Sequence, residues 1–387
     1  MGVAVDPRNV IAVEGSFKVR FFSGRMLARR AAATRRVFGM SRKELHTIRV
    51  GGVPEHFNTP WHTAAASGRL EKAGVKVEWT EFPGGTGAMT KALRDRQVDV
   101  AILLTEGIVA DLHKGSDAKL LGTYVSTPLC WGVHVGARST LESMEDLHEN
   151  KGRYAVSRMG SGSHLMALVD VRTRLGDAAA AALQFEIVGG LSGAKDALKQ
   201  SAELAFMWEK FTTKPLVDSG DLKRIGEVYT PWPCFLLAAT PEALATPQPL
   251  IAMLNAVQAE ANELRARSNA AQVGERSSAS FREAPHIPPY VTPHFPAYSP
   301  YVTPHFPCIS PTPLFLHFFL QVIGDMYGLK YGDVQEWLMS VRWSCTPSLS
   351  LSMLEQVQAA LVEAAVLEPN VLRPPKELLA PITEALD

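Results

Sequence analysis

The chain has 387 residues, 46% hydrophobic and 20% charged, and its 39 basic residues balance 39 acidic ones. These proportions are typical of soluble globular proteins, and the length suggests two lobes with extensions. The balanced charge, with no basic segment interleaved with aromatic residues, argues against nucleic-acid binding. No stretch reaches the roughly 20 apolar residues that a membrane span needs.

Metal and cofactor motifs are absent from the sequence. The four cysteines lie far apart, at positions 130, 234, 308 and 345, and form no CxxC pair. His56 and His62 have no cysteine or acidic partner at a metal-ligand spacing. We therefore expect no metal and no cofactor.

Residues 1–44 are interpreted as a leader. The first 39 residues carry seven arginines but only two acidic residues, Asp6 and Glu14. This composition suits an organelle-import presequence, and an unstructured leader or an over-extended start is the alternative. A secretory signal would need an apolar core that this segment lacks. We therefore expect a cytoplasmic or mitochondrial protein that is not secreted.

After Met40, short β-rich runs alternate with amphipathic stretches. This pattern indicates an α/β protein whose parallel sheets are covered by helices. Thr59 and Pro60 provide a capping hydroxyl and a first-turn proline for one of these helices. The expected strands are residues 47–51, 76–81, 99–104, 132–135, 154–157, 184–188, 204–208 and 235–239.

An internal similarity divides the chain into two related units. Residues 84–94 align without gaps to residues 189–199, and each segment follows an expected strand and opens a helix. Each is followed by an apolar strand that ends in an acidic residue, Glu106 or Glu209. At nearly the same offset, the expected strand-to-helix turn at residues 51–61 corresponds to residues 157–168. The repetition predicts two similar α/β units.

The glycine-rich turns of these units suit an anionic ligand. A helix that begins at such a turn presents free backbone amides and the positive end of its dipole. In open α/β sheets, ligands bind beyond the carboxyl ends of the strands, where these turns lie. We therefore expect a cleft in which residues 85–87 of one unit face residues 160–164 of the other.

The chain resembles the type 2 periplasmic-binding-protein-like superfamily, especially its eukaryotic soluble branch related to nitrate, sulfonate and thiamine-pyrimidine-precursor binding proteins. The resemblance covers roughly residues 45–270 and resumes after about residue 322. The stretches that carry it are residues 50–62, 82–87, 98–107, 156–164 and 205–209.

The resemblance implies two lobes joined by two crossings. Residues 45–128 with 236–387 form a discontinuous first lobe, and residues 129–235 form the second lobe. Pro128, Pro231 and Pro233 stiffen the crossings, because proline fixes one backbone torsion. Closure about this hinge on a small polar or anionic ligand is the expected motion.

The resemblance also implies a set of ligand-binding residues. The hydroxyls of Thr86, Ser161 and Ser163 would hold the anionic group, an aromatic ring would stack on the ligand, and Glu106 or Glu209 would pair with an amine. The alternatives are that the tryptophans fill the core and that the glutamates cap helices. The implied set is His56, Asn58, Trp61, Gly85, Thr86, Gly87, Thr105, Glu106, Ser161, Gly162, Ser163, His164, Trp208 and Glu209.

Two other function classes stay open. One is an enzyme resembling the fungal pyrimidine-precursor synthases of thiamine formation, although the cysteine cluster of those enzymes is absent here. No nucleophile elbow, Walker loop or dinucleotide fingerprint occurs, so we assign no catalytic residue. The other is a metabolite-sensing protein that binds a protein partner of unknown identity.

The region after residue 271 departs from the α/β pattern. Residues 276–313 are rich in proline and contain a near-duplicate, residues 289–296 and 300–307. Closely spaced prolines stop helices and disfavour central strands. We expect a disordered insertion within the first lobe. Amphipathic helix patterns return at residues 322–339 and 351–367 and are expected to pack on that lobe.

Overall fold

The computed structural model describes residues 9–12, 20–23, 45–149, 153–278 and 313–386. It divides into two units, Met1–Leu45 and His46–Asp387. In the first unit, β1 (Asn9–Ala12) pairs antiparallel with β2 (Arg20–Ser23). The rest of the expected leader lies outside the described residues, as do residues 279–312 of the expected proline-rich insertion.

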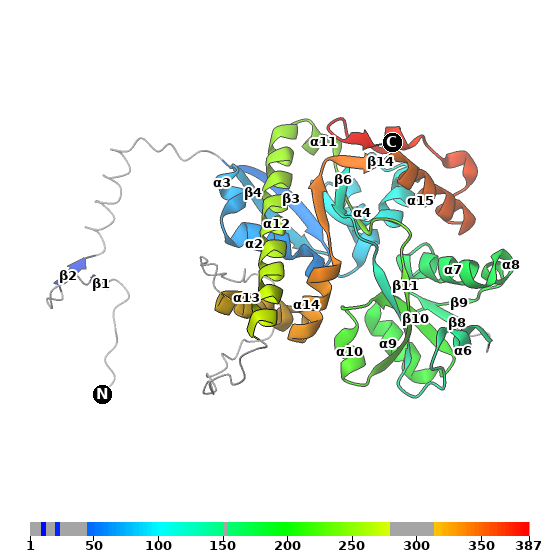
Figure 1. The fold of residues 1–387 in the computed structure, drawn as a ribbon. Coiled ribbons are helices and arrows are strands. Elements are labelled where there is room, and N and C mark those ends of the chain that lie inside the picture. Colours follow the sequence, from blue (N-terminus) through cyan, green and yellow to red (C-terminus); the bar gives the residue numbers. More distant parts are fainter. Residues whose placement is uncertain (1–8, 13–19, 24–44, 150–152, 279–312, 387) are drawn as a thin grey trace. The chain divides into compact units, whose positions relative to one another are not determined.

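A mixed six-stranded sheet, which includes the labelled strands β3, β4 and β6 of Figure 1, forms the centre of the first lobe. Its strand order is β13-β6-β12-β5-β3-β4. β3 runs parallel to β4 and β5, whereas β12 runs antiparallel to both β5 and β6. The strands are β3 (His46–Gly52), β4 (Val75–Glu81), β5 (Val100–Leu104), β6 (Lys119–Val125), β12 (Phe235–Ala239) and β13 (Trp343–Thr346).

A mixed five-stranded sheet forms the centre of the second lobe, with the strand order β11-β7-β10-β8-β9. Here β8 is parallel to β9 and β10, and β7 is antiparallel to β10 and β11. The strands are β7 (Cys130–Gly136), β8 (Arg153–Val156), β9 (Phe185–Ile187), β10 (Leu204–Glu209) and β11 (Leu222–Tyr229).

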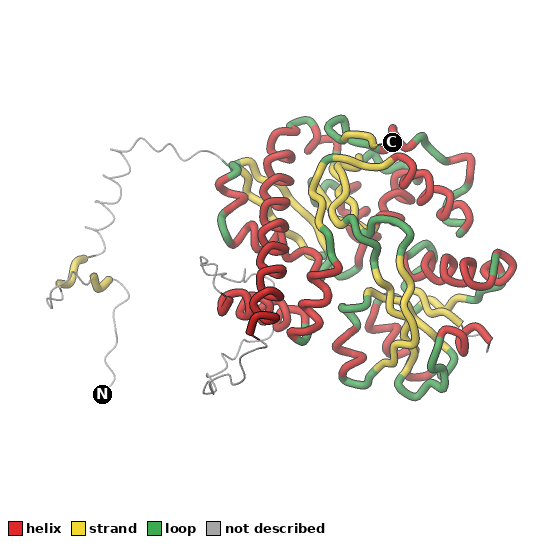
Figure 2. Tube along the Cα trace, in the orientation of Figure 1, coloured by secondary structure: helices red, strands yellow, loops and turns green. Residues whose placement is uncertain are grey.

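Helices lie against the two sheets (Figure 2). The first lobe contains η1 (His56–Asn58), α2 (Thr59–Ala66), α3 (Arg69–Lys72), α4 (Gly85–Arg94), α5 (Thr105–His113), α11 (Pro241–Leu244), α12 (Pro247–Ser278), α13 (Pro313–Tyr327), α14 (Tyr331–Ser340), α15 (Leu351–Glu363), η2 (Pro369–Val371) and α16 (Pro375–Leu378). The second contains α6 (Met144–Glu149), α7 (Gly162–Leu175), α8 (Asp177–Ala181), α9 (Leu191–Gln200) and α10 (Lys214–Asp218). A short parallel pair, β14 (Ser348–Ser350) and β15 (Glu384–Leu386), completes the fold.

The two sheets have matching strand orders, as the prediction of two similar α/β units expects. β4-β3-β5-β12-β6 in one sheet corresponds to β9-β8-β10-β7-β11 in the other. α4 and α9, the helices of the aligned glycine-turn segments, follow the corresponding strands β4 and β9. The repetition in the sequence therefore reflects two similar arrangements of strands and helices.

The expected parallel sheets are in fact mixed, and the crossings account for the difference. The chain leaves the first lobe between β6 and β7 and returns between β11 and β12, with no helix in either connection. β7 and β12 each enter their sheet directly from the other lobe, and each is antiparallel to its neighbours. Parallel neighbours would need a crossover connection within the lobe. The two crossings are hydrogen bonded to each other: the Leu129 amide donates to Thr230 Oγ1 at 2.9 Å, and the Cys234 amide donates to the Thr127 carbonyl at 3.2 Å.

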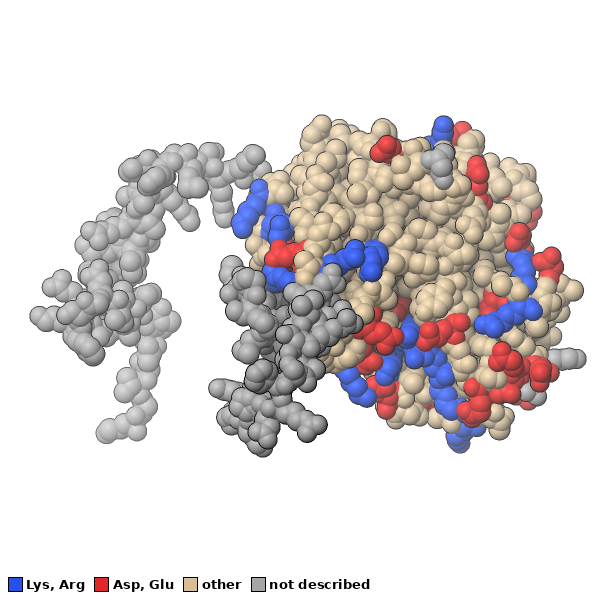
Figure 3. Space-filling view, in the orientation of Figure 1, with Lys and Arg blue, Asp and Glu red and all other residues tan. Residues whose placement is uncertain are grey.

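The hydrophobic core follows from the apolar runs of the central strands. Residues 100–103 of β5 and all of β12 are buried, as expected for strands covered on both faces. Among the described residues, no helix combines the length and the apolar character that a membrane crossing requires. On the face shown in Figure 3, basic and acidic side chains are mixed and form no field of one sign.

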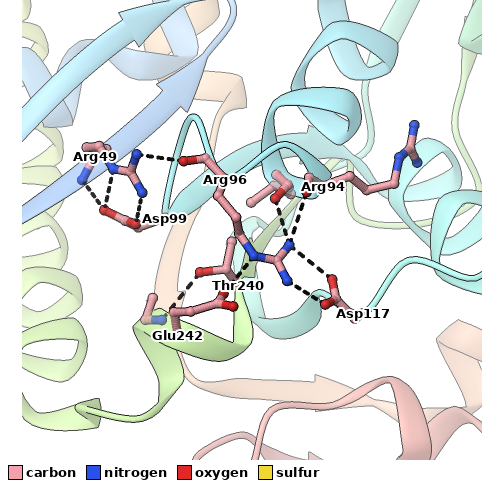
Figure 4. A network of polar contacts seen from close by, with 9 residues as sticks. Arg49, Arg94, Arg96, Asp99, Asp117, Thr240 and Glu242 are labelled. Atoms are coloured by element: carbon pink, nitrogen blue, oxygen red, sulfur yellow. Dashed lines mark hydrogen bonds and ion pairs between the residues drawn. The ribbon is translucent and has the colours of Figure 1, made fainter.

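A network of charged side chains holds the end of α4 that faces away from the glycine turn (Figure 4). Arg96 follows this helix with a φ of 57°, in the left-handed region. Its Nη1 donates to the Leu93 carbonyl at 3.1 Å, while its other nitrogens contact Asp117 at 2.5 Å and Glu242 at 2.8 Å. The guanidinium thus satisfies a helix-end carbonyl and joins α4 to α11.

We expect Arg96→Gly to be more stable than Arg96→Ala by about 1 kcal/mol, because both lose the guanidinium but only glycine adopts a positive φ without cost. Urea unfolding of the two variants beside the wild type measures the difference. Equal stabilities would show that the left-handed backbone at this position is not retained.

Candidate functional site

A cavity of about 430 Å³ lies between the two lobes. It is found where the carboxyl ends of the strands of both sheets meet, as in other open α/β proteins. Its walls come from the equivalent turns of the two units. The lining residues are Val53, Pro54, Glu55, Pro83, Gly84, Gly85, Thr86, Leu104, Leu129, Trp131, Ser157, Arg158, Ser161, Gly162, Ser163, Gly189, Gly190, Leu191, Trp208, Glu209, Thr212 and Phe235.

In the first lobe, the start of α4 forms one wall of the cavity. Gly85 has a φ of 65°, a conformation that favours glycine. Thr86 is buried, and its Oγ1 accepts a hydrogen bond from the Leu104 amide at 3.2 Å. A Cβ on Gly107 would lie 2.4 Å from Thr86 Cγ2, so glycine at position 107 makes room for this threonine. The Thr86 side chain is therefore fixed from both sides.

In the second lobe, three serine hydroxyls gather where α7 begins. Ser161 caps the helix, with its Oγ accepting from the His164 amide at 3.4 Å. Ser163 Oγ accepts from the Ser157 amide at 3.0 Å and lies 3.0 Å from Ser161 Oγ and 3.2 Å from Ser157 Oγ. The start of α7 thus adds hydroxyl groups to the amides that a helix end leaves free.

Arg158 brings a positive charge from the second lobe to the start of α4 in the first. A Cβ on Gly87 would lie 2.9 Å from Arg158 Nη2, so the guanidinium lies against the first turn of that helix. Among the described residues, no carboxylate lies within ion-pair distance of Arg158. Two helix starts and an unpaired guanidinium therefore give this part of the cavity a positive character.

Two carboxylates line the same cavity. Glu209 is buried at the end of β10, and its Oε2 accepts from the amide and the hydroxyl of Thr212, at 2.6 and 2.8 Å. Burial raises its pKa to about 7. Burial, and then the negative charge of Glu209, raise the pKa of Glu55 to about 8. Each carboxylate therefore disfavours ionisation of the other.

Two indole rings complete the walls. Trp131, on β7, is 4% exposed, and Trp208 stacks on Phe206 with ring centroids 5.4 Å apart. The Nε1 atoms of both tryptophans have no hydrogen-bond partner among the described residues. The walls thus combine apolar aromatic surface with a few polar groups, as small-molecule sites do.

The structure places some of the predicted site residues at the cavity and others beside it. Gly85, Thr86, Ser161, Gly162, Ser163, Trp208 and Glu209 line it. The others do not line it. These are His56, Asn58, Trp61, Gly87, Thr105, Glu106 and His164.

Aromatic packing and local hydrogen bonds explain most of these positions. The His56 ring packs against Trp337, with centroids 4.5 Å apart, and burial lowers its pKa to about 3, so it is neutral. Trp61 lies in the core beside Trp79 and Tyr124, as the core alternative for this tryptophan expects. Asn58 Nδ2 donates to the Val53 carbonyl at 2.7 Å and thereby shapes the turn that lines the cavity.

The remaining residues support the turns and the crossing. Thr105 Oγ1 donates to the Pro233 carbonyl in the second crossing. His164 Nδ1 accepts from the Gly160 amide at 3.2 Å, and its ring packs against Phe185, with centroids 4.5 Å apart. Gly87 lies under the Arg158 guanidinium. These residues shape the cavity without lining it.

The sequence prediction does not include Glu55, Trp131 or Arg158, which also line the cavity. Glu55 and Arg158 lie in the same two turns as predicted residues, and only their direction in space distinguishes them from surface charges. Trp131 lies on β7, and only the register of this strand in the sheet decides whether its side chain faces the cavity. Among the described residues, no group of three or more histidine, cysteine or acidic side chains is placed to hold a metal ion.

Glu106 lies behind the cavity where the two lobes meet. It is 2% exposed, and its Oε2 accepts from Trp232 Nε1 at 3.1 Å. Its Oε1 has no partner among the described residues, and a Cβ on Gly162 would lie 3.1 Å from it. Burial raises the pKa of this carboxyl from 4.5 to about 7.

We expect Glu106→Gln to stabilise the protein near pH 8, by on the order of 2 kcal/mol, and to have little effect near pH 5. The raised pKa means that the stabilising contribution of the protonated acid is full below about pH 4.5 and is lost as the pH rises through about 7. Glutamine stays neutral and still offers an oxygen to Trp232. Thermal unfolding at both pH values, with Glu242→Gln as a surface control, measures the effect. The same change at both pH values would contradict it.

The matching sheets, the double crossing and the cavity at facing strand ends define a two-lobed α/β protein with the type 2 periplasmic-binding-protein fold. The family model that matches the chain is that of the Ca3427-like periplasmic binding proteins, and it covers residues 131–228, within the second lobe. A comparison with curated proteins found no match.

Solved structures with the same fold extend the likeness over both lobes. The CA3427 gene product of Candida albicans, described as having the generic periplasmic binding protein fold, gives a TM-score of 0.64 at 23% identity, covering 89% of this chain and 99% of that one. The alkanesulfonate-binding protein SsuA of Xanthomonas axonopodis pv. citri, bound to MOPS, gives a TM-score of 0.58 at 16% identity. The match covers 89% of this chain and 99% of that one. The aliphatic sulphonate binding protein SsuA of Escherichia coli gives a TM-score of 0.57 at 14% identity. The match covers 88% of this chain and 94% of that one. These likenesses establish the fold.

Proposed function

We propose that this chain is a solute-binding protein that closes on a small acidic molecule in the cavity between its lobes. The observation that carries the proposal is Arg158, which has no ion-pair partner in the part of the chain that the structure describes. Its guanidinium lies against the start of α4 beside the serine cluster of α7. Amides at helix starts and a guanidinium favour carboxylate, sulfonate and phosphate groups. The predicted hydroxyl ligands Thr86, Ser161 and Ser163 line the same cavity.

The arrangement of the lobes supports closure as the means of binding. Arg158 comes from one lobe and the α4 turn from the other, so a ligand held by both would join them. Ion pairs already join the lobes on two sides, with Arg172 contacting Glu363 at 2.5 Å and Lys210 contacting Glu336 at 2.8 Å. Motion about the two hydrogen-bonded crossings would open the cavity to solvent.

The proposal keeps the expected lobe limits, residues 45–128 with 236–387 and residues 129–235. The crossings at residues 126–129 and 230–234 support these limits. A cytoplasmic or mitochondrial location is part of the same proposal and is supported by the arginine-rich residues 1–44.

Thermal shift and calorimetry with a panel of small acids test the proposal. The sulfonate binders among the structural relatives make sulfonates the first class to assay, followed by carboxylates and phosphonates. A ligand present at about 100 times its Kd should stabilise the folded protein by about 2.7 kcal/mol. We expect at least one acid to raise Tm and to bind with a stoichiometry of one. The absence of binding by every acid in the panel would overturn the proposal.

A further inference from the structure

The cavity contains a basic group and two acidic groups that do not pair with each other. Arg158, Glu55 and Glu209 all line it, yet the guanidinium is beyond ion-pair distance from both carboxylates. Elsewhere in the protein such groups do form ion pairs, as between Arg172 and Glu363. The unpaired basic and acidic groups of the cavity are therefore available to an occupant.

Nearby protein groups do not neutralise Glu209. Lys210 follows it in the chain, but the Lys210 ammonium pairs with Glu227 at 3.2 Å and with Glu336 at 2.8 Å. The Nε2 atom of His56 lies 3.7 Å from Glu209 Oε2, but the burial of this imidazole keeps it neutral. The Glu209 carboxylate accepts hydrogen bonds from uncharged groups, namely the backbone amides of Phe211 and Thr212 and the Thr212 hydroxyl.

Glu55 and Glu209 act on each other as well. Both carboxyls line the same cavity, and the negative charge of Glu209 adds to burial in raising the pKa of Glu55. A wholly anionic occupant would disfavour the ionisation of this pair further. An occupant with a positive nitrogen would instead let both glutamates ionise.

We propose that the ligand is amphoteric, with an acidic group at Arg158 and a protonated nitrogen between Glu55 and Glu209. This inference rests on the proposed function and narrows its ligand class from small acids to amino acids in the broad sense: amino sulfonates, amino carboxylates or amino phosphonates. The tryptophans Trp131 and Trp208 supply the apolar wall for the carbon atoms between the two charged groups.

Pairs of compounds that differ only at the nitrogen test the inference. Taurine is compared with isethionate, β-alanine with 3-hydroxypropanoate, and 2-aminoethylphosphonate with 2-hydroxyethylphosphonate, all by calorimetry near pH 8. In each pair a hydroxyl replaces the ammonium, and the acidic group is the same. We expect the amine of the best-binding pair to bind about tenfold tighter or more than its hydroxyl partner.

Glu55→Gln and Glu209→Gln assign the preference to the two carboxyls. Each variant should lose most of the preference for the amine and bind the hydroxyl compound at least as tightly as the wild type. Glu242→Gln, in the surface network of Figure 4, is the matched control and should keep the wild-type preference. Retention of the preference in both cavity variants would overturn the assignment.

The wild-type protein provides a second readout that needs no substitution. As the pH rises from about 6 to about 8, Glu209 and Glu55 ionise, so the affinity for the amine should rise and the affinity for the hydroxyl compound should fall. The other charged or titratable groups around the pair are Glu106, Arg158, Lys210, Cys234 and the neutral His56. Parallel pH profiles for the two compounds would contradict the inference.

The outcomes separate this inference from the proposed function. Equal binding of the amine and hydroxyl compounds would overturn the amphoteric ligand and leave a solute-binding protein for small acids. Failure of all six compounds to bind would overturn the proposed function as well.

Discussion

Arg158→Glu is expected to weaken the binding of the best acidic ligand by about a hundredfold or more. The substitution removes the cavity guanidinium and adds a third carboxylate beside Glu55 and Glu209. The ligand's acidic group then meets repulsion where the helix starts of α4 and α7 would otherwise hold it. Titration calorimetry with the tightest compound of the panel measures the loss.

The fold should not change in this variant, because Arg158 is exposed and makes no ion pair among the described residues. Arg138→Glu is the matched control: Arg138 is an exposed arginine of the same lobe whose Nη2 donates to the Lys199 carbonyl at 2.8 Å, outside the cavity. It should bind as the wild type does. Equal binding by Arg158→Glu and Arg138→Glu would show that the acidic group is held elsewhere.

Gly162→Val is expected to reduce ligand binding by at least about a hundredfold, since overpacking at a close contact forces the neighbours apart. A Cβ at this position would lie 2.7 Å from the Trp131 ring and 3.1 Å from Glu106 Oε1. Gly162 opens α7 in the second lobe, whereas Glu106 belongs to α5 in the first. A larger residue here would push the lobes apart and displace a cavity wall.

Gly332→Val is the control for this effect. Gly332 lies in the first turn of α14, and a Cβ there would have no neighbour within 4 Å. Binding should be unchanged in this variant, with circular dichroism reporting the fold of both. Gly162→Ala adds only the Cβ and should show an intermediate loss. Wild-type affinity in both Gly162 variants would mean that the lobes need not approach at this point for binding.

Most of the fold can be predicted from the sequence, because its strands are short apolar runs bounded by glycine and acidic residues. The expected strand at 235–239 coincides with β12, and the expected strand at 204–208 differs from β10 by one residue. β6 and β11 are not predicted. β6, residues 119–125, leads directly into the first crossing, so its end is not marked in the sequence. In β11 the polar Lys223, Arg224 and Glu227 interrupt the apolar pattern that would identify a strand.

The candidate site is predictable only as far as its turns. The free backbone amides at a glycine-rich helix start do not depend on side-chain packing. The starts of α4 and α7 can therefore be recognised from the positions of their glycines in the sequence. Side chains such as His56 and Trp61 depend on packing across the lobe, and they face the core. Arg158 and Glu55 become cavity residues only when the two lobes meet, and local sequence carries no signal for that.

Hydrogen exchange tests the central claim most directly, because it locates the ligand on the chain without assuming which compound binds best. With the tightest compound bound, amides in residues 84–93 and in residues 157–168 should both exchange more slowly, since one ligand contacts the starts of α4 and α7 together. Protection confined to one of these segments, or found only outside both, would contradict a shared site between the lobes.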